Sequence, residues 1–190
     1  MTKNRLEAFR DGVIAIIITI MVLEIKVPHG DTWADVAPIL PVFISYVMSF
    51  LFILIYWNNH HHLFQTVKHI NGKILLANGH LLFWLSLMPF VTGWMGENHF
   101  TQLPVMVYGI VTVFSAIAYF ILSQLLVAHH GKDSTLAIAI GKDKKGIISL
   151  FIYIIGVFAS FIHPYISCAR YFSVTIMWLI PDKRIEDVIE

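Results

Sequence analysis

Six apolar stretches joined by short connections are the feature that most limits how this chain can fold. They cover residues 8–25, 37–57, 74–95, 103–127, 147–162 and 164–180, and no connection has room for a soluble domain. About 20 apolar residues cross the hydrocarbon core of a bilayer as a helix. With 57% hydrophobic and 13% charged residues, the composition also excludes a soluble globular protein. We therefore expect an all-α integral membrane protein, with one domain over residues 1–190 and six transmembrane helices.

The basic residues predict how these helices are oriented. Of thirteen Lys and Arg, eleven fall on the N-terminus, the second and fourth connections and the C-terminus, namely Lys3, Arg5, Arg10, Lys68, Lys73, Lys132, Lys142, Lys144, Lys145, Lys183 and Arg184. Six spans place all of these segments on one side, and the positive-inside rule makes that side cytoplasmic. Both termini are then expected in the cytoplasm. The opposite side carries Lys26 and four acids, Glu24, Asp31, Asp35 and Glu97, which are read either as solvated loop residues or as a weak attraction for cations.

The first apolar stretch, within Arg5 to Pro28, is unusually short and is bracketed by charge. Only the residues from Gly12 to Leu23 lie between Asp11 and Glu24. A helix that faces lipid needs a longer apolar run, and charged residues within membrane helices usually face a bundle interior or a water path. We expect protein or water, rather than lipid, to surround this helix.

A helical wheel divides the first helix into two faces. At about 100° per residue, a single stripe contains Gly12, Ile16, Thr19, Ile20 and Leu23, whereas Asp11 and Ala15 point away from it. Branched aliphatic side chains with one hydroxyl suit a narrow, water-excluding pore constriction. The same spacing is also typical of an ordinary packed core, so periodicity leaves both interpretations open.

Asp11 is expected to need hydrogen-bond partners, because a carboxylate taken out of water is costly unless it is paired. It lies at the depth where the second helix ends and the third begins. We predict that it points into the subunit, in a structural hydrogen-bond network that ties the first helix to the next two. The expected members are Arg5, Asp11, Trp57, Asn58, His61 and Asn78.

The spaced pattern RxxxFxDGVxAIxxTxxxLxxxxP, read from Arg5, resembles the transmembrane protein 175 family, the lysosomal potassium channel and its bacterial six-helix relatives. Downstream matches are His61-His62-x-Phe64, Asn78 and Pro89-Phe90-x-Thr92. The resemblance implies a homotetramer in a bacterial plasma membrane, with the first helix of each subunit lining the pore. By position, it places the constriction on Ile16, Ile20 and Leu23 and a threonine on Thr19. The family signature Phe-Ser-Asp-Gly reads Phe9-Arg10-Asp11-Gly12 here, so Arg10 replaces a serine.

The expected function is a leak-type cation channel that conducts potassium with weak selectivity and needs no cofactor. The alternatives are a secondary transporter, which would want a polar midplane site and internal repeats, or a channel that also passes protons. An enzyme is not expected, because clustered acids or metal ligands are few. The ten histidines include His60-His61-His62, but no HExxH or Cys/His spacing predicts a metal site.

Overall fold

The computed structural model describes residues 3–65, 67, 69–131, 134, 137 and 143–179, and in this part of the chain all regular structure is helical. The longer helices have the following bounds: α1 Lys3–Leu23, α3 Leu40–Gln65, α4 Gly72–Ser86, α5 Met88–Glu97, α6 Gln102–His130, α8 Lys144–Ala159 and α9 Pro164–Leu179. A short helix, α2 (Trp33–Val36), and a 3-10 turn, η1 (Ala37–Ile39), lead directly into α3.

Local chemistry explains where several helices begin and end. The side chain of Asn71 accepts a hydrogen bond from the Ile74 amide (2.9 Å) and caps α4, as Asp143 caps α8 by accepting from the Gly146 amide (3.2 Å). Gly131, at a φ of 93°, follows the last residue of α6. Such a backbone angle suits glycine, which has no Cβ, so the helix ends there at little steric cost.

The third apolar stretch is two helices rather than one. The α-helical run stops at Ser86 and resumes at Met88, with Leu87 between them and Pro89 in the first turn of α5. Proline has no amide hydrogen to donate to the carbonyl four residues earlier, and its ring crowds that carbonyl. The break therefore has its cause in the sequence, at Pro89.

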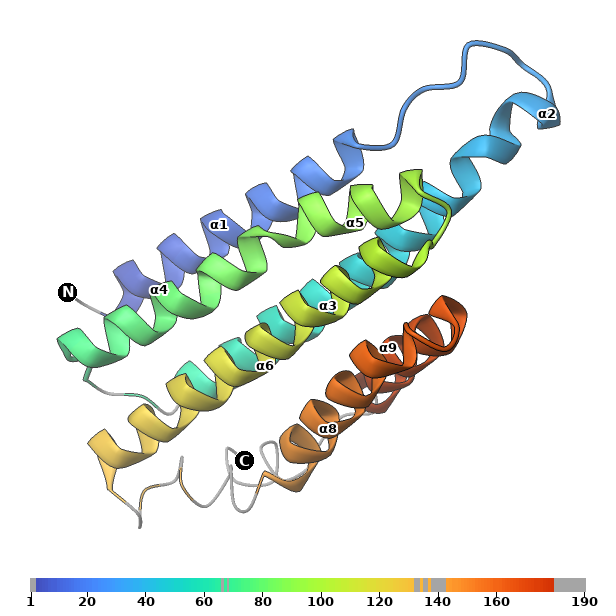
Figure 1. Ribbon diagram of the computed structural model, residues 1–190. Helices are drawn as coiled ribbons and strands as arrows, with labels where there is room; N and C mark the ends of the chain where they lie inside the picture. Colours follow the sequence, from blue (N-terminus) through green and yellow to red (C-terminus); the bar gives the residue numbers. More distant parts are fainter. Residues whose placement is uncertain are drawn as a thin grey trace.

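The helices form a bundle in which α1 lies at one edge (Figure 1). Helix α1 packs against α3, α4 and α5, while α6 contacts α4, α5, α8 and α9. Helices α8 and α9 form a hairpin on the other side of α3 and α6, away from α1 (Figure 1). As a result, α1 has neighbours of its own subunit on one side only.

Three helical stretches of the described chain are long and apolar enough to cross a membrane, namely Trp33–Gln65, Gly72–Glu97 and Gln102–His130. Helix α1 carries Glu7, Arg10 and Asp11 within its length. Helices α8 and α9 have 16 residues each. At about 1.5 Å per residue, 16 residues rise about 24 Å, less than the hydrocarbon core of about 30 Å.

Candidate functional site: the outer face of helix α1 and its anchor

Helix α1 has a buried ridge and an exposed face. The ridge follows helical spacing through Leu6, Arg10, Ile14, Ile17 and Met21, all buried. This is the i, i+3, i+4 pattern that brings side chains to one side of a helix. The ridge packs α1 against α3, α4 and α5 and fixes how the helix is rotated.

The four residues expected at the pore constriction all lie on the exposed face. Ile16 is 58% exposed, Ile20 42% and Leu23 79%, and Thr19 is exposed as well. The Thr19 hydroxyl donates to the Ile16 carbonyl (2.9 Å) within the helix, so only its oxygen lone pairs remain for a ligand. A Cβ added at Gly12 would meet no atom within 4 Å. The chain thus presents Ile16, Ile20 and Leu23, with Thr19 among them, on a face that the described part of its own subunit covers only in part.

Asp11 bonds to Trp57 of α3, as the predicted network has it, but it is not buried in the subunit as expected. Its side chain is 48% exposed, and the neighbouring Arg10 is the buried one, at 1%. Ala15, expected to point the same way as Asp11, is exposed too. The reason is that the buried ridge runs through residue 10, which places Asp11 one residue, or about 100°, further round the helix.

Arg10 holds the carboxylate of Asp11 and reaches into the subunit. Its Nε and Nη2 donate to Asp11 Oδ1 at 3.0 and 2.7 Å, and its Nη1 lies 2.6 Å from His60 Nδ1. Trp57 Nε1 donates to the same carboxylate oxygen at 3.0 Å. An arginine buried in this way is paired rather than free, as a buried cation must be. Two hydrogen bonds therefore join α1 to α3, one made by Arg10 and the other by Asp11.

His60 extends the hydrogen-bond network from α3 to α4. Because a guanidinium only donates, His60 Nδ1 must accept from Arg10, and the ring proton then lies on Nε2. Nε2 lies 2.7 Å from Asn78 Oδ1, which accepts it. Phe64 stacks on the imidazole ring, with centroids 4.4 Å apart. The order Asp11, Arg10, His60, Asn78 thus spans three helices, and each buried polar group in it has a partner.

The other residues predicted for this network lie elsewhere. Arg5 and Asn58 are exposed, and within the described part of the chain no hydrogen bond connects either of them to Asp11. His61 bonds to Gln65 (2.9 Å) and stacks on Trp57. The residues that sequence reasoning left out of the network are Arg10 and His60. Both residues are visible in the sequence as polar positions near Asp11 and near the end of the second apolar stretch. They were left out because an acid, rather than an arginine, was expected to be the buried group.

A second buried polar chain crosses the bundle nearer the far end of α1. Thr92 of α5 donates to Ser49 of α3 (2.6 Å), and Ser49 donates to the Tyr108 hydroxyl of α6 (3.2 Å). Thr92 also lies 3.9 Å from the sulfur of Met21 on α1. These bonds hold the helices behind α1 in one arrangement.

At the end of α1, two charged groups pair outside the bundle. Lys26 Nζ lies 2.7 Å from Glu97 Oε1 of α5, and both side chains are exposed. The hydrogen bond to Glu97 and the charge of that carboxylate raise the pKa of Lys26 above its ordinary value. Glu24 lies against Gly93, where an added Cβ would meet its carboxylate at 3.4 Å. No group of three or more His, Cys, Asp or Glu suited to hold a metal ion occurs in the ranges that the structure describes.

Comparison with known proteins places this arrangement among channels. The family model described as the endosomal/lysosomal potassium channel TMEM175 matches residues 5–89. A potassium channel of Chryseobacterium sp. (strain P1-3) is 59% identical over 186 residues, which cover 98% of this chain and 97% of that protein. The endosomal/lysosomal proton channel TMEM175 of Gallus gallus is 28% identical over 145 residues, covering 68% of this chain and 29% of its own length.

A solved structure is similar over nearly the whole fold. It is the crystal structure of a lysosomal potassium-selective channel TMEM175 homolog from Chamaesiphon minutus. The two chains superpose with a TM-score of 0.77 at 29% sequence identity, over 94% of this chain and 96% of that one. The likeness therefore includes α8 and α9, which lie beyond the residues that the family model matches.

Proposed function

Since this chain belongs to the transmembrane protein 175 (TMEM175) family, which comprises ion channels and not an enzyme class, we propose that it conducts potassium ions through a membrane. The relatives named potassium channels, one of them at 59% identity, support the choice of ion. No cofactor is needed for passive conduction, in which the permeating ion is the only ligand.

The pore is formed by the exposed face of α1, contributed by four copies of the chain around one axis. The observation that carries this proposal is the row Ile16, Thr19, Ile20 and Leu23, three large aliphatic side chains and one threonine that the subunit leaves exposed. One helix cannot enclose a water path, whereas closed cyclic symmetry brings identical faces together. Six spans per subunit follow if α4 and α5 cross together and α1, α8 and α9, too short or too charged to cross alone, are shielded by neighbours.

Selectivity for potassium over sodium is expected to be weak. Apolar side chains offer an ion no oxygen ligands, and Thr19 supplies only one hydroxyl oxygen per subunit, too few to replace the water around an ion. The constriction then works by excluding water and by its width. The network of Asp11, Arg10, Trp57, His60 and Asn78 anchors α1 at one end, so that the face keeps its rotation.

The test compares ion flux through Ile16→Asn with flux through the wild type, in liposomes under imposed potassium or sodium gradients. An amide at the constriction wets it, so potassium flux should rise several-fold and the potassium preference should fall. Ile148→Asn is the matched control, because Ile148 is similarly exposed (49%) but lies on α8. Wild-type flux in Ile16→Asn, in protein that folds and assembles, would contradict the constriction.

A proton pathway is the second candidate, because the relative from Gallus gallus is named a proton channel. It is separated from the first by the same liposomes carrying a pH-sensitive dye and a proton gradient. Acidification that continues when potassium is replaced by a large organic cation would indicate proton conduction. A current that requires a gradient of a second ion would instead indicate a secondary transporter.

We place the protein in a bacterial plasma membrane with both termini in the cytoplasm. The basic residues at the N-terminus and at the start of α8, Lys144 and Lys145, support this orientation.

A further inference from the structure

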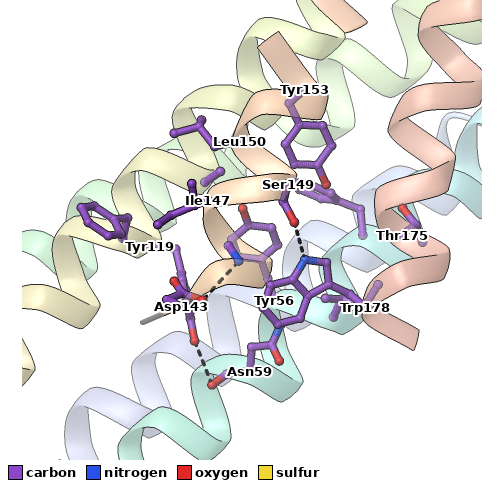
Figure 2. A pocket seen from close by; sticks show the side chains of 15 residues that line it. Tyr56, Asn59, Tyr119, Asp143, Ile147, Ser149, Leu150, Tyr153, Thr175 and Trp178 are labelled. Carbon is purple, nitrogen blue, oxygen red and sulfur yellow. Dashed lines mark hydrogen bonds between the residues drawn. The ribbon is translucent and has the colours of Figure 1, made fainter. Parts of the chain in front are cut away.

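A cavity on the opposite side of the bundle from α1 belongs to neither the pore face nor the network behind it. It lies among α3, α6, α8 and α9 and has a volume of about 130 Å³ (Figure 2). A cavity of this size in a close-packed helix bundle costs stability unless it is filled. An engineered apolar cavity of about 150 Å³ holds benzene. The volume therefore suits a molecule about as large as one six-membered ring.

Most of the cavity wall offers an occupant no hydrogen bond. Its apolar side chains include Phe52, Ile55, Ala116 and Leu150. Polar side chains of the wall bond to protein instead. Trp178 Nε1 donates to the Ser149 hydroxyl (2.8 Å), and the Tyr119 hydroxyl donates to the Asn59 carbonyl (3.3 Å). The body of the occupant should therefore be apolar.

Tyr153 of α8 is the exception among these wall residues. It is 4% exposed, and its ring projects with the hydroxyl toward the other side chains that line the cavity (Figure 2). Within the described part of the chain, this hydroxyl has no hydrogen-bond partner. A buried phenol normally has one, because an unpaired donor away from water costs stability. The cavity therefore contains a donor that an occupant with an acceptor atom would satisfy.

Water fills this cavity less well than one ring-sized molecule does. A water molecule needs about 10–15 Å³ of such a cavity and two to four polar partners. One water bonded to Tyr153 would leave most of the 130 Å³ empty. Further waters would face the apolar part of the wall, where partners are too few.

The charge in the wall favours a neutral occupant. Asp143 lines the cavity, and its carboxylate accepts from the Gly146 amide (3.2 Å) as the cap of α8. An anion would be repelled by this carboxylate, and a cation would have to compete for it. Either ion would also exchange its hydration for mostly apolar surroundings, which is costly. A neutral molecule has none of these costs.

The cavity reaches the surface of the helix bundle between α6 and α8. Two of its wall residues, Phe120 and Ile147, are 43% and 45% exposed. In a membrane this surface is next to acyl chains, in which neutral apolar molecules dissolve. Such a molecule can enter the cavity from the bilayer without passing through water.

We infer that this cavity binds one neutral, ring-sized apolar molecule that carries an acceptor such as a carbonyl oxygen, and that the acceptor bonds to the hydroxyl of Tyr153. The site is independent of the pore proposed above, since none of its wall residues is on α1. Its occupant contacts α3, α6, α8 and α9 and so stabilises the hairpin of α8 and α9 on the rest of the subunit.

The test uses cyclohexanone as the probe and methylcyclohexane, a similar ring without an acceptor, as its match. With the full-length protein in lipid nanodiscs, the fluorescence of Trp178 is the difference between wild type and Trp178→Phe. A ketone quenches an indole that it contacts, so cyclohexanone should quench Trp178 along a curve that saturates. Methylcyclohexane should reverse this quenching, at about fivefold higher concentration, because it lacks one hydrogen bond. Quenching that rises without saturation, as random contact in the bilayer gives, would overturn the inference.

Tyr153→Phe separates the hydrogen bond from the fit of the ring. It should weaken cyclohexanone binding about fivefold, the equivalent of one hydrogen bond, and leave methylcyclohexane binding unchanged. Tyr165→Phe is the matched control and should bind as the wild type does, because Tyr165 is 59% exposed and outside the wall. Equal affinity of these two variants for cyclohexanone would refute the role of Tyr153.

Ala116→Leu tests the place of binding, since it fills the cavity from α6. It should abolish the saturable quenching, and saturable quenching that persists in it would show that the ring binds elsewhere. If Ala116→Leu fails to fold, the comparison of Tyr153→Phe with Tyr165→Phe remains decisive.

Discussion

Arg10 is the residue on which the position of α1 most depends. It is 1% exposed and makes three hydrogen bonds, two to Asp11 and one to His60. A guanidinium suits this place because its donors are fixed in a plane and can serve a carboxylate and an imidazole at once. Lysine has a compact ammonium group and cannot present the same fork, so it would not be an equivalent replacement.

Replacing Arg10 by methionine should destabilise the protein. His60 Nδ1 would lose its donor in a buried place, which costs about 1–3 kcal/mol, and among the described residues Asp11 would keep Trp57 alone as a hydrogen-bond partner. For a chain of this size, 1 kcal/mol corresponds to roughly 2–4 °C in Tm. Thermal unfolding in detergent measures the change.

Lys73→Met is the control for this substitution, because it removes a cation from an exposed position on α4. The triple variant Arg10→Met, His60→Leu and Asn78→Leu sharpens the result, because His60 also donates to the buried Asn78 Oδ1. When all three buried partners become apolar, much of the loss should disappear. An equal loss in Arg10→Met and Lys73→Met, or no recovery in the triple variant, would show that the buried network is not what holds α1.

Sequence reasoning reached this site only in part, and the reason lies in Arg10. The wheel grouped Ile16, Thr19, Ile20 and Leu23, which are exposed, but it turned Asp11 and Ala15 inward, whereas the buried ridge runs through Arg10. A carboxylate next to an arginine gives no sign of which of the two is buried. Burial of Arg10 depends on His60, which is 50 positions away in the chain, and through His60 on Asn78, which is further away still. Such partners become visible only when the helices are placed in space.

At the scale of helices, two glycines set how closely α6, α8 and α9 approach one another. A Cβ at Gly109 of α6 would overlap the Tyr171 hydroxyl and lie 2.9 Å from Val157 Cγ2. A Cβ at Gly156 of α8 would lie 2.5 Å from Cε1 of the same tyrosine. Small residues at helix contacts allow backbones to come together, and here they make room for the ring of Tyr171.

Gly109→Ala should therefore push α6 and α9 apart. Forcing an extra carbon into a packed core costs about 1–3 kcal/mol. Tyr171→Phe removes the hydroxyl that a Cβ at position 109 would overlap. The two changes together should therefore lower the free energy of unfolding by less than the sum of the single changes. Gly79→Ala is the control, since a Cβ there meets nothing within 4 Å and alanine stabilises an exposed helix by about 0.5–1 kcal/mol. Additive losses in unfolding experiments would contradict this account of the contact.

The end of α3 and the break between α4 and α5 show that hydropathy predicts helix ends poorly. The apolar run of the second stretch stops near residue 57, yet α3 continues to Gln65 through Asn58, Asn59 and three histidines. Polar side chains do not end a helix when its backbone bonds continue, and His60 and Phe64 pack inward there. Pro89, in contrast, breaks the third stretch although hydropathy is unchanged across it. Hydropathy predicts the apolar segment, while backbone chemistry decides where the helix ends.

For the whole molecule, the exposed face of α1 is the surface that the proposed assembly brings together with further copies of the chain. Isolated exposed aliphatic residues are common on proteins, but four residues in register along one helix form a continuous strip. The buried side of α1 is occupied by α3, α4 and α5. The proposed assembly around α1 is thus the arrangement that uses both sides of the helix.

A cysteine at Ile20 tests this assembly and the pore together. In a Cys168→Ser background, which removes the chain's single native thiol, Ile20→Cys adds one thiol per subunit, and the proposed tetramer would bring four of them together around its axis. Cadmium is bound by such soft ligands, so it should block potassium flux into liposomes, and a thiol competitor should restore it. Val22→Cys is the control, since Val22 is similarly exposed (44%) but lies about 200° away around the helix. Flux that cadmium leaves unchanged in Ile20→Cys, or blocks only in Val22→Cys, would mean that this face of α1 does not line the ion path.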